Sequence, residues 1–261
     1  MQDRERRARW PIIDIHCHTS HTDPTTTDTL AEEVRAWGIC RALLLGDVYA
    51  YGANPTPRQV RTINDGTAES VRRYPDLFSG MCFMNPQNPP SFLDEEIRRC
   101  ITGLGFVGVK LETSLRASDR RMDPLMETAR SLGMPVLQHA WYKAFPDNEL
   151  ESTPADVADL ARRHPGVTIV MAHLGGCGIR GVRDVAPLPN VSVDTSGSQP
   201  TSGIVEYAVS VLGADRVLYG TEAPGRDIAA QLGRVYGARV TDAVRRRILH
   251  DNAARIFRLA C

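Results

Sequence analysis

Short apolar runs alternate with amphipathic segments along almost the whole chain from Pro11 onward. The runs have the length and composition of β-strands. They cover residues 12–18, 40–46, 78–85, 106–112, 136–139, 167–173, 191–195 and 217–222. Several of them, such as 42–45 and 168–171, are continuously apolar, which indicates strands buried on both faces of a parallel sheet.

Segments with helical periodicity separate the predicted strands. They cover residues 30–37, 58–74, 91–101, 124–132, 154–164 and 204–212. Thr29, Ser91 and Thr153 are predicted N-caps, and Pro154 then stands at a first helical position. The sixth connection, 175–189, is too rich in glycine and proline to predict a long helix.

Repeated strand–helix units, about 30 residues apart, predict parallel strands joined by crossover helices. Eight such units favour an α/β fold of the (β/α)8 TIM-barrel type, for which 261 residues is an ordinary length. The alternative, a doubly wound open sheet, would need a phosphate-binding glycine turn after an early strand, and the sequence has none. We expect residues 1–261 to form a single domain, with 1–10 as a solvated arm and 241–261 as extra helices.

Composition narrows the choice of partners. Hydrophobic residues make up 42% and charged residues 24% of the chain, and the formal net charge is zero. A neutral chain gives no electrostatic reason to expect a nucleic-acid or membrane partner. No apolar run reaches the roughly 18 residues that cross a bilayer, and no secretory signal is visible. The six cysteines show no paired spacing, so we expect free thiols in a cytoplasmic protein.

Two histidines one residue apart, His16 and His18, end the first predicted strand within PIIDIHCHTS (11–20). In an extended strand they share one face, about 6.6 Å apart, and Cys17 takes the opposite face. Both imidazoles can therefore reach one divalent ion between them. Alone, this pair is weak evidence, because a surface coincidence explains it equally well.

Further polar side chains end the later strands. They are Lys110, Glu112, His139, His173 and Glu222. In a barrel of this type the active site lies at the carboxyl ends of the strands, so these groups should converge. The imidazoles of His16, His18 and His139 with the carboxylate of Glu222 suit one divalent metal, zinc or alternatively manganese, with a position open for water. Such an ion lowers the pKa of bound water towards about 7.

The remaining candidates have roles beside the metal. His173 is a candidate for handling a proton, since imidazole titrates near pH 6.5, and a core histidine bonded to a carbonyl is the alternative. Lys110 and Arg226 are candidates for holding an anionic group of the substrate, against a satisfied buried lysine and a solvent-facing arginine. Trp141 either forms a pocket wall or packs against a helix. Asp14 is expected to be a buried acid that supports the metal ligands.

The chain resembles the amidohydrolase superfamily, in the amidohydrolase-related group that includes metal-dependent lactonases, hydrolases and decarboxylases. The motifs that carry the resemblance are DIHCH (14–18), YPDLFSGMCFMNP (74–86), GFVGVKL (105–111), DPLMETARSLGMPVLQHA (123–140), MAHLGG (171–176), VLYGTEAP (217–224) and NAARIF (252–257). The resemblance implies a (β/α)8 fold with His16, His18 and His139 as metal ligands. His173 matches the proton-handling histidine of the sixth strand, and Glu222 matches the acid of the eighth.

Glu222 departs from the family pattern, which has aspartate in a sequence like YGTD. Misplacing a catalytic group by about 1 Å can cost around 10²-fold in rate, so the extra methylene matters. The opening DIHCHTSHTD (14–23) also resembles the polymerase-and-histidinol-phosphatase phosphoesterases, but the later motifs are not theirs.

The function expected from the sequence is a metal-dependent hydrolase. It would attack a small ester, lactone or amide with metal-activated water, with Glu222 and His173 handling protons. The first alternative is a metal-dependent non-oxidative decarboxylase of a small aromatic or muconate-type carboxylic acid. The second is a non-catalytic binding protein on the same fold, suggested by Glu222. The expected partner is a small anionic molecule, and the resemblance also suggests a homodimer.

Overall fold

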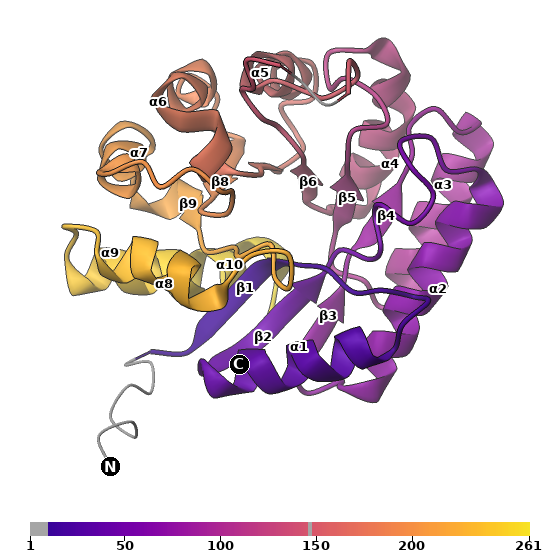
Figure 1. Cartoon of the computed structure of the whole chain (residues 1–261). Helices are drawn as coiled ribbons and strands as arrows, with labels where there is room; N and C mark the ends of the chain where they lie inside the picture. Colours follow the sequence, from indigo (N-terminus) through magenta and orange to yellow (C-terminus); the bar gives the residue numbers. More distant parts are fainter. Residues whose placement is uncertain (1–9, 146–147) are drawn as a thin grey trace.

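Parallel strands surrounded by helices make up the structure, a computed structural model that describes residues 10–145 and 148–261 (Figure 1). The predicted N-terminal arm, apart from its last residue, lies outside the described residues. The strands are β1 (Ile12–Cys17), β2 (Ile39–Leu44), β3 (Phe78–Gly80), β4 (Cys82–Met84), β5 (Val109–Leu111), β6 (Val136–Gln138), β7 (Ile169–Met171), β8 (Val191–Asp194) and β9 (Val217–Leu218).

The strands close into one barrel. Two parallel sheets, β1-β2-β3 and β4 to β9, share one strand position, because β3 and β4 are interrupted only at Met81. The backbone N–H of Met81 donates to the carbonyl of Leu44 at 2.9 Å. Between the last strand and the first, the N–H of Ile15 donates to the carbonyl of Tyr219 at 3.1 Å. The predicted (β/α)8 fold is therefore confirmed.

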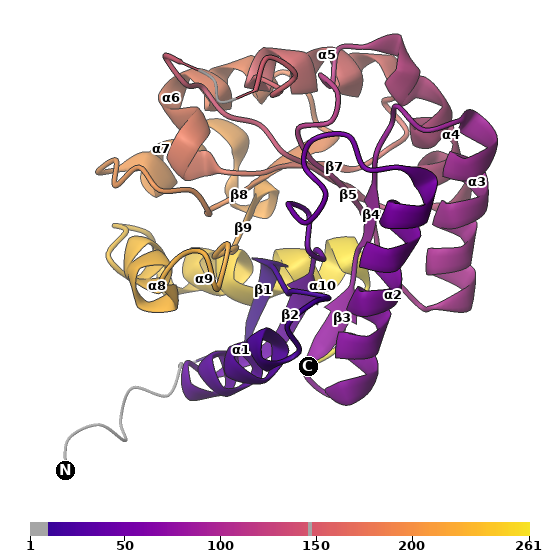
Figure 2. The same ribbon diagram turned by 45° about the vertical axis from the view of Figure 1, so that its right-hand side comes forward.

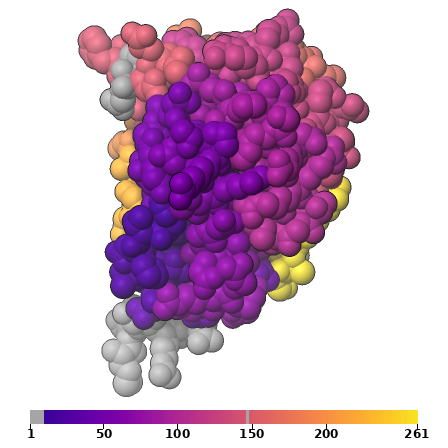
Figure 3. Space-filling view, turned by 90° about the vertical axis from the view of Figure 1, so that its right-hand side faces the viewer, coloured from indigo at the N-terminus to yellow at the C-terminus, as the bar shows by residue number. Residues whose placement is uncertain are grey.

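Helices form the outer layer of the barrel. They are α1 (Thr25–Ala36), α2 (Pro57–Arg73), α3 (Pro90–Arg98), α4 (Asp123–Leu132), α5 (Pro154–Arg163), α6 (Leu174–Val185), α7 (Ile204–Leu212), α8 (Ile228–Tyr236), α9 (Asp242–Arg246) and α10 (Asn252–Phe257). The C-terminal helix α10 lies beside β1 in both ribbon views, and α8 and α9 lie on the same side of the barrel (Figure 2). Seen from one side, the surface is formed mainly by the first half of the chain (Figure 3). Within the described residues, no helix combines the length and the apolarity that crossing a bilayer requires.

The helix boundaries show which local signals decide them. Thr153 caps α5 as predicted: its hydroxyl accepts from the backbone N–H of Asp156, whose carboxylate accepts in return. The prediction at Thr29 is wrong, because α1 already begins at Thr25. The expectation of no long helix in the sixth connection is confirmed. There α6 runs through Gly178, which leaves helical geometry at φ 62° and ψ −163° and so joins two short helical pieces.

Two apolar clusters form the core. The cluster inside the barrel contains Ile13, Ile15, Leu43, Leu45, Met81, Leu137, Val170 and Leu218, with Phe257 of α10 packed against it. The larger cluster, between strands and helices, contains Ile12 and Cys17. Each such side chain stabilises the fold by about 1.5–3 kcal/mol when fully buried. Ile15 and Cys17 are two residues apart yet contact different clusters, because β1 pairs irregularly between Asp14 and Cys17. The irregularity lies where the first-strand histidines leave the sheet.

A disulfide joins Cys40, in β2, to Cys261, the last residue of the chain. Their Cα atoms are 5.8 Å apart, across a sequence separation of 221 residues. The prediction that all cysteines are free thiols is wrong for this pair, because spacing in the sequence does not reveal contacts that only the closed barrel creates. The other four cysteines are buried free thiols.

Candidate active site

His16 and His18 leave the end of β1 with their ring centroids 5.3 Å apart. Nδ1 of His16 lies 2.8 Å from a carboxylate oxygen of Asp194, and Nδ1 of His18 lies 3.2 Å from the carbonyl of Gly46. An ionised carboxylate and a carbonyl only accept hydrogen bonds, so each Nδ1 carries the proton and each Nε2 presents a lone pair. Metal-binding histidines are typically held in this way.

Asp194, at the end of β8, fixes two parts of the site at once. While one of its oxygens holds His16, the other accepts the backbone N–H groups of His173 at 2.9 Å and Ser196 at 3.0 Å. Burial opposes ionisation of this carboxyl, but His16 and the hydrogen bonds from Ser196 and His173 keep its pKa below the ordinary value. The sequence places Asp194 at a strand end, but no local pattern shows that it orients His16.

Asp14 is buried, as predicted, and supports the backbone rather than the imidazole rings. It accepts from the backbone N–H of His16 at 3.0 Å and from the hydroxyl of Thr221 at 2.6 Å. Burial raises its pKa to about 6. It therefore ties the first strand to the segment that precedes Glu222.

His173 is the histidine at the centre of the group. Its ring centroid lies 5.0 Å from that of His16, 4.7 Å from that of His139 and 5.0 Å from that of Trp141. In the described part of the chain, neither ring nitrogen has a hydrogen-bond partner. Burial, with His139 and His16 nearby, lowers its pKa well below the ordinary value. It is therefore a neutral imidazole at pH 7.

Trp141 packs on His173 and is itself held in place by a glycine. A Cβ atom on Gly176 would lie 2.4 Å from the indole ring, so only glycine leaves room for it. The ammonium group of Lys143 lies 5.3 Å from the centroid of the same ring. Trp141 thus supports the histidine group by packing against His173.

Glu222 follows β9 in a left-handed conformation, with φ 72°. Its backbone N–H donates to the carbonyl of His16 at 2.7 Å, which fixes the segment against the first strand. A residue with a Cβ in this conformation carries a strain of roughly 1–3 kcal/mol. Its buried carboxylate oxygen Oε2 lies 3.8 Å from Nε2 of His173 and 3.6 Å from Nε of Arg226.

His139 reaches the same rim, but carboxylates engage both of its ring nitrogens. Nδ1 lies 3.1 Å from Glu112 and Nε2 lies 2.8 Å from Glu151. Burial disfavours the charged ring, but these carboxylates raise the pKa of His139 above its ordinary value. In this arrangement His139 offers no lone pair to a metal. Glu151 lies in a loop without a strand or helix pattern, and sequence reasoning missed it.

Lys110 is completely buried, and its Nζ lies 2.8 Å from Oε1 of Glu112. Although burial opposes ionisation of Glu112, Lys110 and His139 lower its pKa well below the ordinary value. Lys110 thus forms a buried ion pair with Glu112, and its role in holding an anionic group of the substrate stays a prediction. A cavity of about 220 Å³ opens instead beside His18 and Glu222, with Tyr49 and Pro224 among its lining residues.

The donor atoms at the rim have the chemistry of a metal site without its finished geometry. Among residues 10–145 and 148–261, no three His, Cys, Asp or Glu side chains are already arranged to hold an ion. Yet Nε2 of His16 and Oε2 of Glu222 are buried without a hydrogen-bond partner in that part of the chain. Buried polar atoms are normally paired, so these atoms fit a cation that small side-chain movements would complete.

Residues 13–259 match the family model described as amidohydrolase. The chain belongs to the amidohydrolase family. A relative within it is the gamma-resorcylate decarboxylase of Rhodococcus jostii strain RHA1. The two are 26% identical over an alignment of 253 residues, gaps included, which covers 76% of each chain.

Solved structures of the family resemble the barrel closely. A 2,6-dihydroxybenzoate decarboxylase in complex with 2,6-dihydroxybenzoate gives a TM-score of 0.79 at 21% identity, over 96% of this chain and 100% of that one. A dihydroxybenzoic acid decarboxylase from Polaromonas sp. JS666, with bound manganese and the inhibitor 2-nitroresorcinol, gives 0.77 at 19% identity, over 95% and 97%.

These relatives confirm the family that the sequence motifs indicated and correct the expected reaction. The similar proteins are named as decarboxylases, so the prediction of a hydrolase acting on an ester, lactone or amide is wrong. The first alternative, decarboxylation, is the one that the relatives favour. Zinc gains no support, since the ion in the Polaromonas structure is manganese.

Proposed function

We propose that this protein is a metal-dependent, non-oxidative decarboxylase of a small hydroxylated aromatic acid. One observation carries the proposal: two imidazoles with anchored Nδ1 atoms stand beside the unpartnered carboxylate oxygen of Glu222. In a family whose similar members are decarboxylases, that group of donors supports the same chemistry.

The metal would be held by His16, His18 and Glu222. A divalent cation there, manganese by analogy with the Polaromonas protein, would neutralise and orient the carboxylate of the substrate. His139 would join as the predicted fourth ligand only by releasing Glu112 or Glu151, because both of its nitrogens are engaged.

Proton transfer would fall to Glu222 and His173. In the reaction a proton adds to the ring carbon that bears the carboxylate; the carbon–carbon bond then breaks, carbon dioxide leaves, and the bonding electron pair returns to the ring. The Oε2 atom of Glu222 has no hydrogen-bond partner among the described residues and lies 3.8 Å from a neutral imidazole, so the two side chains can pass a proton between them. Arg226, 3.6 Å from Glu222, would orient that carboxylate.

The open cavity suits a single aromatic ring. It has about 220 Å³ and is bordered by His18, Glu222 and the exposed Tyr49. The rings of Tyr49 and His18 are 6.2 Å apart, which gives one side an aromatic wall. Such a cavity would hold a monocyclic acid with its carboxylate towards the histidines.

The test is carbon dioxide release from 2,6-dihydroxybenzoate by the manganese-loaded protein. In heavy water the resorcinol formed should carry one deuterium on the carbon that lost the carboxylate. His16→Ala should abolish both manganese binding and carbon dioxide release, whereas His250→Ala, on a helical turn away from the rim, should change neither. A loaded protein that releases no carbon dioxide from any hydroxylated benzoate would overturn the proposal.

A further inference from the structure

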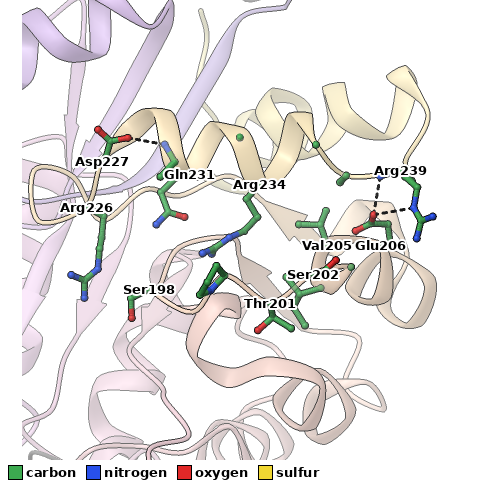
Figure 4. Close-up of a pocket in the computed structure, with 17 residues that line it drawn as sticks. Ser198, Thr201, Ser202, Val205, Glu206, Arg226, Asp227, Gln231, Arg234 and Arg239 are labelled. Carbon is green, nitrogen blue, oxygen red and sulfur yellow. Dashed lines mark hydrogen bonds and ion pairs between the residues drawn. The ribbon is translucent and has the colours of Figure 1, made fainter.

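A second and larger cavity, of about 740 Å³, lies between α7 and α8, beside the barrel mouth rather than in it (Figure 4). The loop after β8 and the first turn of α7 form one wall, and α8 forms the other. The loop contributes the hydroxyl-bearing residues Ser198, Thr201 and Ser202. The volume is within the range of about 300–1,000 Å³ typical of small-molecule sites.

Gln231 supplies the strongest sign of a ligand. Its side chain points from α8 into the cavity, and the residue is only 4% exposed (Figure 4). The amide nitrogen donates to the carbonyl of Gly197 at 3.1 Å. The amide oxygen is buried and has no donor among the residues that the structure describes. Buried acceptors are normally paired, so this position calls for a hydroxyl or N–H group from outside the chain.

The arginines that line the cavity differ in how free they are to bind a ligand. Arg234 is committed to the backbone, because it donates to the carbonyls of Ser196, Gly197 and Gln199 at 2.9 to 3.2 Å. Arg239 has a side chain that is 93% exposed and lies near Glu206.

The two carboxylates on the wall are engaged as well. Asp227 accepts the backbone N–H of Ala230 at 2.7 Å, and Glu206 accepts that of Arg239 at 2.9 Å. Of the two arginines left facing the cavity in the described part of the chain, Arg226 is the less exposed, at 42% against 93% for Arg239. It contacts Glu222 at 3.6 Å and donates to the carbonyl of Gly225 at 3.4 Å. One end of the cavity therefore presents a positive charge, and its middle presents a hydrogen-bond acceptor.

We infer that this cavity binds a polyhydroxylated organic anion of about hexose size. Its single carboxylate or phosphate would face Arg226, and one of its hydroxyls would donate to the amide oxygen of Gln231. The hydroxyls of Ser198, Thr201 and Ser202 would serve the remaining oxygens. The start of α7 lies on the same wall, and its N-cap, Gly203, supplies no side-chain cap for the first N–H groups of the helix. The inference does not depend on the reaction at the barrel mouth.

Calorimetric titration of the full chain tests it with D-glucuronate, glucose 6-phosphate, glucose and inorganic phosphate. We expect at least one of the two hydroxylated anions to bind at least tenfold more tightly than glucose or phosphate, since only these ligands carry both groups. The better of the two identifies the anion as a carboxylate or a phosphate. Binding of neither anion, or binding of inorganic phosphate as tight as that of the better anion, would overturn the inference.

Gln231→Leu should weaken the binding about tenfold. The matched control is Gln87→Leu, a rim glutamine whose amide is already bonded to Ser114. Thr201→Val, on the opposite wall, tests the same cavity if Gln231→Leu fails to fold. It should weaken binding about threefold. Unchanged affinity in folded Gln231→Leu and Thr201→Val would contradict the assignment. So would competition between glucuronate and 2,6-dihydroxybenzoate, because that would place the anion in the barrel mouth.

Discussion

The histidines at the rim differ in where their protons are held. His16 and His18 keep theirs on Nδ1, and burial together with His16 and Lys110 lowers the pKa of His18 to about 3. His173 is neutral for the same reason of burial beside other imidazoles. His139, between two carboxylates, instead has a raised pKa. The side of the site with His16 and His18 is therefore suited to a cation, and His139, on the other side, retains a proton.

Asp194 should control metal affinity without touching the ion. In Asp194→Asn the carboxylate that fixes the Nδ1 proton of His16 is lost, and losing such a partner typically costs 10- to 100-fold in metal affinity. Calorimetric titration with Mn²⁺ measures the change. Asp47→Asn, another aspartate at the rim, is the control and should bind Mn²⁺ as the wild type does. Equal affinities for both variants would contradict the role of Asp194.

Glu222 should tolerate shortening better than neutralisation. Aspartate adopts left-handed conformations more readily than glutamate, so Glu222→Asp keeps the charge and relaxes the backbone. We expect Glu222→Asp to retain at least a tenth of the rate of carbon dioxide release. Glu222→Gln should lose about 10²- to 10⁴-fold, the usual contribution of a proton-transferring group. Comparable rates in the Gln variant and the wild type would remove Glu222 from the chemistry.

At the scale of elements, α8 holds the loop that carries the site. Arg234 reaches across from α8 to the carbonyls that directly follow Asp194. Arg234 fits there because Gly175 has no side chain. A Cβ atom on Gly175 would lie only 2.4 Å from a guanidinium nitrogen of Arg234. The position of Asp194, whose carboxylate holds His16, therefore depends on contacts between α8, the start of α6 and the end of β8. These elements are far apart in the sequence.

A buried carboxylate joins α2 to α3 and predicts a pH dependence. Glu96 accepts from Asn64 at 2.9 Å and from Nε of Arg99 at 2.8 Å, and it also bonds Arg61. Burial opposes its ionisation, but Arg99, Asn64 and Arg61 lower its pKa below the ordinary 4.5. Its stabilising contribution is therefore present above about pH 4.5 and is lost as the pH falls through the lowered pKa.

Glu96→Gln should therefore lower the free energy of unfolding by about 3 kcal/mol at pH 7, and by less below pH 4. Urea denaturation of the variant and the wild type at pH 7 and pH 3 measures the loss in the free energy of unfolding. Glu95→Gln, at an exposed neighbour that also pairs with Arg61, should change stability by no more than about 0.5 kcal/mol. The same loss at pH 3 and pH 7 for Glu96→Gln would show that ionisation is not responsible.

At the scale of the molecule, the features that can be predicted from the sequence are those that depend on local patterns of residues. Alternating apolar runs gave the barrel, and the strand-end rule brought His16, His18, His139, His173 and Glu222 to one rim. The contacts that decide their states come from elsewhere. Glu151 engages His139 from an irregular loop, and Asp194 engages His16 across 178 residues. No periodicity reports such long-range pairing, and the cavity between α7 and α8 likewise depends on how finished elements pack.

The disulfide is the clearest long-range feature, and it should contribute to stability. Closing so long a loop restricts the unfolded chain, and removing a native disulfide typically costs 2–5 kcal/mol. Cys261→Ser should accordingly lower the melting temperature, and reducing agent should lower that of the wild type but not of the variant. Thiol titration of the denatured, unreduced protein should find four free groups; six would contradict the bond. Disulfides are rare in reducing compartments, so cysteine usage no longer supports a cytoplasmic location.

The position of that bond also determines how the protein is best handled. Cys40 is the second residue of β2, at the amino end of the barrel, whereas the histidines lie at the carboxyl end. A tag or surface linker attached after residue 261 would therefore emerge from the face opposite the barrel mouth. Molecules immobilised through their C-termini would all present that mouth to the solution.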